Sequence, residues 1–289
     1  MASPLRLALL CPLVAVVVSA VVPSGAAAAD FPPITDAERA LTAVPGEANA
    51  PAVVLAKSAE LWLMDAANQG VSSRLVSRVR LKILTEQGKS HGEIEIPHSG
   101  FVRLTKLEGR TVLPDGRVVP LPKDARFERR LSKAEKLFVT AVAFPAVEAG
   151  AILDYTYELR FESIFYLEPW FLADVIPVRR AEILFHVPAE LGVQAWNRDP
   201  FGIGLHMETE RVSHGAGKAR VWGENLPAVP VEPFGPPFSD LAAQAMLLPV
   251  ELVHAGDQRL LMKSWETTSE LIFELQYRKA WRRDGAAVR

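Results

Sequence analysis

The sequence predicts a mainly β protein, in which an antiparallel β-sandwich-like domain is followed by a proline-rich connector and a C-terminal α-helix. Several segments alternate apolar and polar residues with a period of two, which is typical of strands that bury one face. Turn signals separate these segments at short spacing, and helical patterns are few. With 289 residues, 49% of them hydrophobic, the chain is long enough to bury a substantial core.

The N-terminal residues 1–29 are predicted to be a secretory signal peptide and not part of the fold. Arg6 supplies the positive start, residues 7–22 are predominantly apolar, and a run of alanines ending at Ala29 suits cleavage. An uncleaved anchor is the alternative, but the apolar run is shorter than the ~20 residues of a spanning helix. We therefore expect an exported, periplasmic or extracellular protein with no stable membrane span after cleavage.

The single cysteine of the chain, Cys11, lies inside this expected signal peptide. The mature protein would then have no disulfide, no thiolate zinc site and no cysteine nucleophile. The net charge of −2 provides no basic excess to neutralise phosphates, so nucleic acid is not an expected partner.

The first half of the domain begins with a helix and continues as strands. Thr35 and Glu38 form a capping-box pattern, which predicts a short helix. Residues 52–62 are apolar and could be strand or helix. Residues 75–83 alternate, and their charged positions are expected to be solvated. Four further β segments follow, at 93–96, at 110–113 and 117–121 around the turn Pro114-Asp115-Gly116, and at 138–144.

The second half continues the β pattern before composition changes. The segment 123–136 is rich in charge and is predicted to be a surface excursion or a short helix. The clearest strand covers 153–162, with Tyr155 and Tyr157 on its apolar face. Further strands are expected at 181–187, 192–196, 205–212 and 218–222.

These patterns divide the chain into a signal peptide (1–29), a β-sandwich-like domain (30–223), a proline-rich linker (224–262) and a helix (263–289). Ser264 is a plausible N-cap of that helix. Four apolar residues recur along it at helical spacing: Trp265, Leu271, Ile272 and Leu275. They form either a docking face for a partner domain or a face packed on the β domain, and the sequence favours neither.

No residue is assigned a catalytic, cofactor-binding or metal-binding role. No G-x-S-x-G pattern is present, and no histidine lies in an H-E-x-x-H motif. His91 and His98 flank Glu93 and Glu95, which could be a metal or acid–base cluster, but solvated positions at strand ends are the favoured interpretation. No cofactor is expected.

Two further groups are weighed as contacts. Arg110, Asp115 and Arg117 bracket the hairpin and could contact a ligand or partner, although turn geometry and cross-strand charge pairing explain them more simply. Tyr155 and Tyr157 could form a binding face, but such alternation is more often core.

Several segments, in order, resemble a known family. They are "DFPPITDAERAL" near the mature start, "APAVVL" at 50–55, "VRLKILTEQGK" at 79–89, "EGRTVLPDGRVVPL" at 108–121 and "FPAVEAGAILDYTYEL" at 144–159. Together they resemble the domain of unknown function that precedes the catalytic domain of many exported bacterial transglutaminase-like proteins. The resemblance covers about residues 30–223 and implies a β-rich, sandwich-like fold.

In that family a proline-rich connector leads to a papain-like domain, and residues 248–275 resemble the connector and the opening helix of that domain. The segments that hold the family's catalytic Cys, His and Asp have no counterpart here. We therefore expect a non-catalytic accessory domain of an exported transglutaminase-like protein, as a fragment or a natural short form. It would position the catalytic domain or bind its protein or peptide substrate. The alternative is a free-standing periplasmic module that binds a peptide, a glycan or a protein.

Overall fold

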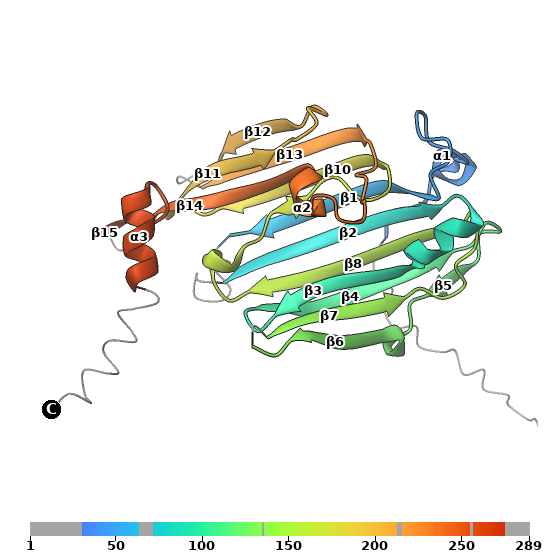
Figure 1. Cartoon of the computed structure of the whole chain (residues 1–289), viewed down its shortest axis with the longest axis horizontal. Coiled ribbons are helices and arrows are strands. Elements are labelled where there is room, and N and C mark those ends of the chain that lie inside the picture. The colour runs from blue at the N-terminus through green and yellow to red at the C-terminus, as the bar shows by residue number, and fades with distance from the viewer. Residues whose placement is uncertain (1–30, 64–71, 135, 213–215, 255–256, 275–289) are drawn as a thin grey trace, which may run out of the picture. The chain divides into compact units, whose positions relative to one another are not determined.

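The computed structural model describes residues 31–63, 72–134, 136–212, 216–254 and 257–274. The expected signal peptide lies outside these ranges, as do Leu275 and the rest of the C-terminal segment. The fold is mainly β, as the sequence predicts, with three sheets and three short α-helices in the described ranges (Figure 1). None of the described helices is both long and apolar enough to cross a bilayer.

The largest sheet has eight strands in the order β12-β13-β10-β1-β2-β8-β4-β5. Its strands are β1 (Ala52–Trp62), β2 (Ser73–Ile83), β4 (Val102–Val112), β5 (Val118–Pro120), β8 (Ile152–Phe161), β10 (Val178–Val187), β12 (His206–Arg211) and β13 (Gly217–Leu226). The segment 52–62, left open between strand and helix, is therefore a strand. Neighbouring strands are antiparallel except β1 and β10, which pair in parallel.

Two smaller sheets complete the β structure. One contains β11 (Leu191–Arg198), β14 (Gln244–His254), β15 (Asp257–Leu260) and the short β9 (Trp170–Phe171). The other has the order β3-β7-β6 and contains β3 (Glu93–Ser99), β6 (Arg126–Ser132) and β7 (Leu137–Ala143). The charged segment expected as an excursion or helix thus contains an exposed strand, β6, because pairing with β7 satisfies its backbone.

The helices are α1 (Asp36–Ala40), α2 (Phe238–Leu241) and α3 (Trp265–Phe273), with 3₁₀ turns at Glu86–Gly92, Lys123–Ala125 and Ile164–Tyr166. The predicted capping box is confirmed at Thr35 and Glu38, where each residue bonds the backbone N–H of the other. Ser264 is confirmed as the N-cap of α3, because its hydroxyl accepts from the Thr267 N–H.

The main core lies between the inner face of the large sheet and the two smaller sheets. Buried side chains from every layer belong to it, among them Phe185 of the large sheet, Ile96 of β3 and Leu247 of β14. The outer face of the large sheet is covered in part by the N-terminal segment, where Ile34 and Leu41 pack on a separate apolar cluster.

That covering segment corrects one expectation about β2. Its charged positions are not all solvated, because Arg80 is 8% exposed and Lys82 only 2%. Lys82 Nζ donates to the carbonyl oxygens of Glu38 and Arg39 at the end of α1. The alternation predicted the strand correctly, but both of its faces are covered there.

The proline-rich segment 224–262 also differs from the expected linker. Residues 244–254 and 257–260 form β14 and β15, and β14 is the central strand of its sheet. Pro249 is accommodated because the register with β11 shifts between Gly192 and Val193, directly beside it. Proline in a paired strand is tolerated at such irregularities, which composition alone does not reveal.

Candidate functional site

A pocket of about 470 Å³ opens between the large sheet and the two smaller sheets. Its floor is the inner face of the large sheet, including Leu61, Leu75 and Tyr157. One wall is β3, and the facing wall is the segment 167–176 together with part of β14. Pockets of a few hundred cubic ångströms with mostly apolar linings are typical of ligand sites.

The strand alternation explains why these side chains meet. Tyr155 and Tyr157 share the inner face of β8 with Leu153, Leu159 and Phe161, so the interpretation of this face as core is confirmed. The two tyrosine rings stack 6.5 Å apart between centroids. The same side chains that close the core therefore also form the pocket floor.

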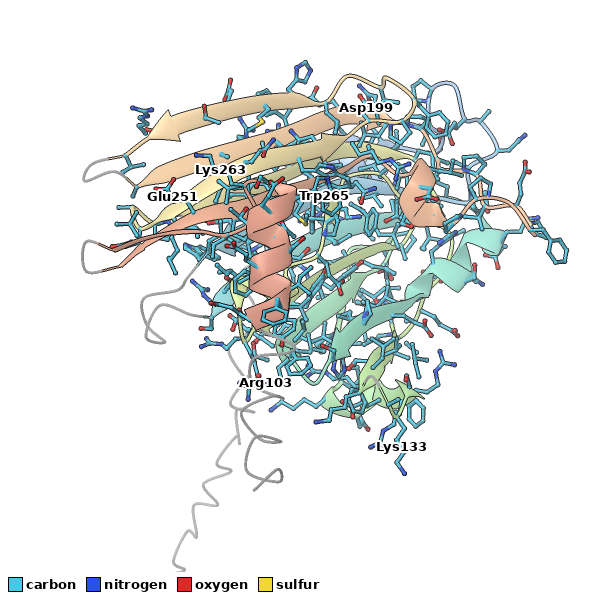
Figure 2. The ribbon with its side chains drawn as sticks, turned by 60° about the vertical axis from the view of Figure 1, so that its left-hand side comes forward. Arg103, Lys133, Asp199, Glu251, Lys263 and Trp265 are labelled. Carbon is cyan, nitrogen blue, oxygen red and sulfur yellow. The ribbon has the colours of Figure 1, made fainter. Side chains whose placement is uncertain are left out.

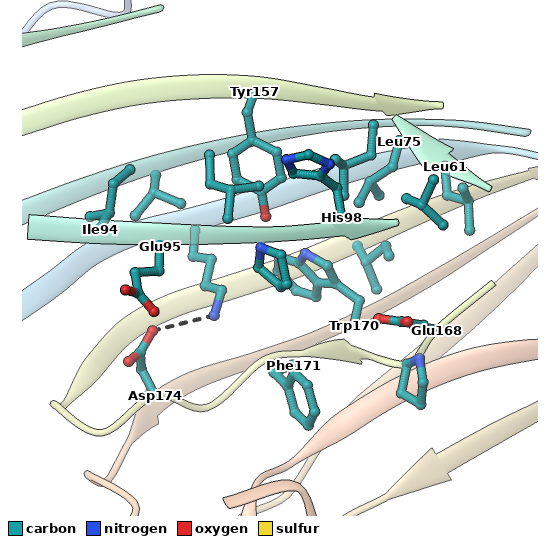
Figure 3. A pocket seen from close by; sticks show the side chains of 18 of the residues that line it. Leu61, Leu75, Ile94, Glu95, His98, Tyr157, Glu168, Trp170, Phe171 and Asp174 are labelled. Atoms are coloured by element: carbon teal, nitrogen blue, oxygen red, sulfur yellow. Dashed lines mark hydrogen bonds and ion pairs between the residues drawn. The ribbon is translucent and has the colours of Figure 1, made fainter. Parts of the chain in front are cut away.

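An ion pair lies among the apolar side chains of the pocket interior. Lys57 Nζ lies 3.4 Å from Asp174 Oδ2 and 5.4 Å from the centroid of the Trp170 ring. The Lys57 side chain is 14% exposed and that of Asp174 is 35% exposed, so the carboxylate lies nearer the mouth. The dashed line in Figure 3 marks this pair, in which Lys57 comes from β1 of the floor and Asp174 from the wall that faces β3.

The tyrosine hydroxyls are the other polar groups of the floor. Burial raises the pKa of Tyr155 far above its usual range, and the nearby Tyr157 and Asp174 raise it further. Burial also raises the pKa of Tyr157, although a hydrogen bond with Ser77 opposes the effect. No hydrogen bond joins the Tyr155 hydroxyl to another residue in the described ranges, so this group is available to a ligand.

His91, which lies before β3, and His98, which lies within it, do not form a metal centre with Glu93 and Glu95. His98 Nε2 lies 3.0 Å from Thr140 Oγ1, and its ring stacks on Phe138. With its side chain only 10% exposed, His98 is not the solvated residue that the sequence suggested, because β7 covers it. No group of three or more His, Cys, Asp or Glu side chains suited to a metal ion occurs in the ranges that the structure describes.

Carboxylates surround the mouth of the pocket. Glu93 and Glu95 on β3 are exposed, as is Glu168 on the facing wall. Glu95 is paired with Arg129 at 3.0 Å. In Figure 3 the side chains of Glu95 and Asp174 point toward one another across the opening. The mouth thus favours a cationic group over an anionic one.

The hairpin residues that the sequence singled out lie away from the pocket. Arg110 donates to Asp154 Oδ2 from Nε at 3.0 Å and from Nη2 at 2.8 Å, within a buried ion network. Asp115 accepts from the Arg117 backbone N–H at 2.9 Å, and Gly116 takes φ +89° in the confirmed turn. Each of the three candidates thus takes part in charge pairing or in the turn, and whether they also contact a partner stays a prediction.

The residues of α3 divide between two environments. Leu271 is buried in the main core, whereas Trp265 is 84% exposed and Ile272 is 46% exposed. Figure 2 shows Trp265 at the start of the helix. Leu275 lies outside the described residues. One side of α3 thus packs on the β domain, and another side leaves large apolar groups uncovered in the described part of the chain.

Sequence patterns did not point to Lys57, Trp170 or Asp174. Trp170 and Asp174 belong to an irregular segment with no clear strand or helix period. Lys57 lies in the segment 52–62, for which the sequence did not decide between strand and helix. A lysine inside an apolar run was the one available signal, since such a group needs a partner when buried.

Comparison with known proteins gives a family and a fold. The model of DUF3857, described as a domain of unknown function with a solved structure, matches residues 72–229. No curated protein matches the sequence. Among solved structures, one described as a "putative protease" from Parabacteroides distasonis is 20% identical with a TM-score of 0.57, covering 68% of this chain and 40% of that one.

Leukotriene A4 hydrolase from the yeast Saccharomyces cerevisiae is a more distant match. It is 8% identical with a TM-score of 0.33, covering 64% of this chain and 30% of that one. The chain thus spans less than half the length of the solved proteins that it resembles.

Proposed function

This chain belongs to the DUF3857 family. We propose that it is a non-catalytic substrate-binding domain of an exported, transglutaminase-like protein. In this role it binds a protein or peptide substrate and holds it for a catalytic domain. The pocket between the sheets is the observation on which this function rests.

The pocket has the composition of a recognition site. Aliphatic and aromatic side chains line most of it, and its polar groups lie on the floor and around the mouth. Lys57 is held by Asp174, whereas the Tyr155 hydroxyl has no partner in the described ranges. Such a site gains affinity from apolar burial and orientation from a small number of hydrogen bonds.

Two observations support a non-catalytic role within a larger protein. Cys11 is the sole cysteine of the chain, and it lies in the predicted signal peptide, so a thiol nucleophile would be lost on export. The fold also matches 40% of a chain described as a "putative protease", which is consistent with one module of a longer enzyme.

Binding of an unfolded protein by the purified chain tests the proposal. We expect fluorescently labelled, carboxymethylated α-lactalbumin to bind, without cleavage and without transfer of a labelled amine to glutamine. Val175→Trp, at the half-exposed pocket mouth, should weaken binding, whereas Val118→Trp on the exposed hairpin strand β5 should not. Catalytic turnover, or binding that is unaffected by the pocket substitution, would refute the proposal.

The free-standing binding module remains the second candidate, since the burial of Leu271 attaches α3 to its own β domain. The two candidates differ in the open reading frame. An open frame that continues past Arg289 into a cysteine-containing segment supports the substrate-binding domain, and a stop codon at that point supports the free-standing module.

A further inference from the structure

Strand β3 is an edge strand with one side unpaired. It pairs with β7 and with no other strand in the described part of the chain. The Gly92 carbonyl accepts from the Phe144 N–H at 2.9 Å, and the Gly100 N–H donates to the Lys136 carbonyl at 3.0 Å. Since hydrogen-bonded pairs alternate along an antiparallel ladder, the even-numbered residues of β3 direct their backbone groups to β7.

The odd-numbered residues of β3 consequently direct their backbone groups away from β7. Glu95 presents an N–H and a C=O on this side, and Pro97 presents a C=O. Within the described ranges, these outward backbone groups of Glu95 and Pro97 make no hydrogen bond to another backbone group. Pro97 occupies a position where the missing N–H would have pointed outward, which is where an edge strand tolerates proline.

This unpaired edge borders the pocket. Residues 93–99 of β3 line it, and Ile94 and Ile96 face the apolar interior while Glu93 and Glu95 face outward. A chain that paired with the edge would repeat this alternation, because side chains point to opposite faces of a strand. Its inward side chains would enter the pocket, and its outward side chains would lie beside the two glutamates.

The carboxylates at the pocket mouth determine which outward side chains of a bound chain are favoured. In the described ranges Glu93 and Glu168 have no basic partner, and Glu95 and Asp174 have one each, so the mouth retains a net negative charge. Basic side chains are thus favoured beside β3, and acidic ones are repelled.

We propose that the pocket edge binds an extended peptide by β-strand addition to β3, with large apolar side chains entering the pocket and alternate basic side chains meeting Glu93 and Glu95. The main-chain hydrogen bonds supply affinity, and the pocket and the acidic mouth supply the sequence preference. This inference rests on the proposed function and specifies the substrate class of the same pocket.

Peptides of defined pattern test the inference with the full chain after Ala29. The probe is fluorescein-labelled Gly-Lys-Phe-Lys-Leu-Lys-Gly, measured by fluorescence polarisation. The first control peptide has the same composition in blocks, Gly-Lys-Lys-Lys-Phe-Leu-Gly, and the second replaces lysine with glutamate. We expect the alternating peptide to bind at least about tenfold more tightly than either control, because only it satisfies both faces.

Backbone pairing is tested separately from charge. N-methylation of alternate amides removes donors on one side of the peptide, and one of the two possible patterns should weaken binding by about tenfold. Glu95→Pro removes the outward N–H and should weaken binding, while Glu95→Gln keeps the backbone and should lose only the salt-dependent part. If Glu95→Pro does not fold, the N-methylated peptides still report on the edge.

The outcomes separate this inference from the proposed function. Equal binding of the alternating and block peptides, or no effect of either N-methylation pattern, overturns strand addition even if unfolded protein still binds. Failure of every peptide and of unfolded protein to bind overturns the proposed function as well.

Discussion

The buried carboxylate of Asp154 is expected to be among the most sensitive single positions for stability. It is 2% exposed and accepts from Arg80 Nε at 2.7 Å and from Arg110 Nη2 at 2.8 Å. Arg80 also donates to both oxygens of Glu38, at 3.0 and 3.1 Å, and to the Pro32 carbonyl. The network thereby connects three strands of the large sheet to the N-terminal segment that covers them.

Replacing Asp154 by asparagine removes the charge while keeping the size of the side chain. Removal of one partner from a buried ion pair typically costs about 3–5 kcal/mol, since the remaining charge stays buried. Because Arg80 keeps its ion pair with Glu38, we expect the free energy of unfolding to fall by about 3 kcal/mol, at the lower end of that range. At about 2–4 °C per kcal/mol for a chain of this size, the melting temperature should fall by roughly 6–12 °C.

Urea unfolding followed by tryptophan fluorescence measures the loss, and calorimetry measures the melting temperature. Asp115→Asn is the matched control, because it makes the same chemical change in an ion pair whose side chains are 52% and 73% exposed. The control should unfold like the wild type. If the free energy of unfolding of the Asp154→Asn variant lay within about 1 kcal/mol of the wild-type value, the network would stabilise the fold no more than a surface ion pair does.

Three further outcomes follow from the structure. Burial raises the pKa of Glu38, but hydrogen bonds from the Thr35 N–H and Arg80 outweigh it, leaving the pKa below its usual 4.5. Its stabilisation is present above that value and is lost as pH falls through the folded pKa. The melting temperature of the Glu38→Gln variant should therefore lie below that of the wild type at neutral pH, and the difference between the two should shrink in acid. Gly88→Ala should cost about 1–3 kcal/mol in urea unfolding, because the added Cβ would lie 2.0 Å from a backbone carbonyl oxygen; an unchanged midpoint would contradict this. Leu271→Ala should lower the free energy of unfolding by about 2 kcal/mol because Leu271 is buried, whereas Trp265→Ala should leave it unchanged because Trp265 is exposed. Equal losses for the two variants would contradict this difference in burial.

The local chemistry of the sequence predicted the strands and several of their details. Period-two alternation identified β8 and placed Tyr155 and Tyr157 on its inner face. Pro114-Asp115-Gly116 predicted the hairpin, because only certain residues adopt the backbone angles of such a turn. These features depend on neighbours in the chain, so no knowledge of the tertiary fold was needed.

Contacts between distant segments could not be predicted in the same way. Residues 244–254 follow a proline-rich stretch and contain Pro249, which argues against a central strand, yet they form β14 because the register with β11 shifts beside that proline. The pocket likewise combines Lys57, Trp170 and Asp174 from segments far apart in the sequence. No local pattern encodes which distant segment will lie opposite.

The sequence by itself determined a mainly β fold, its turns and caps, and the inner face of each clear strand, because propensity and periodicity act over a few residues. Only the tertiary structure decided that Arg80 and Asp154 are buried under the N-terminal segment, and that β3 ends its sheet as an open edge beside a pocket. Burial and edge position depend on which elements pack together, and packing is a property of the whole chain.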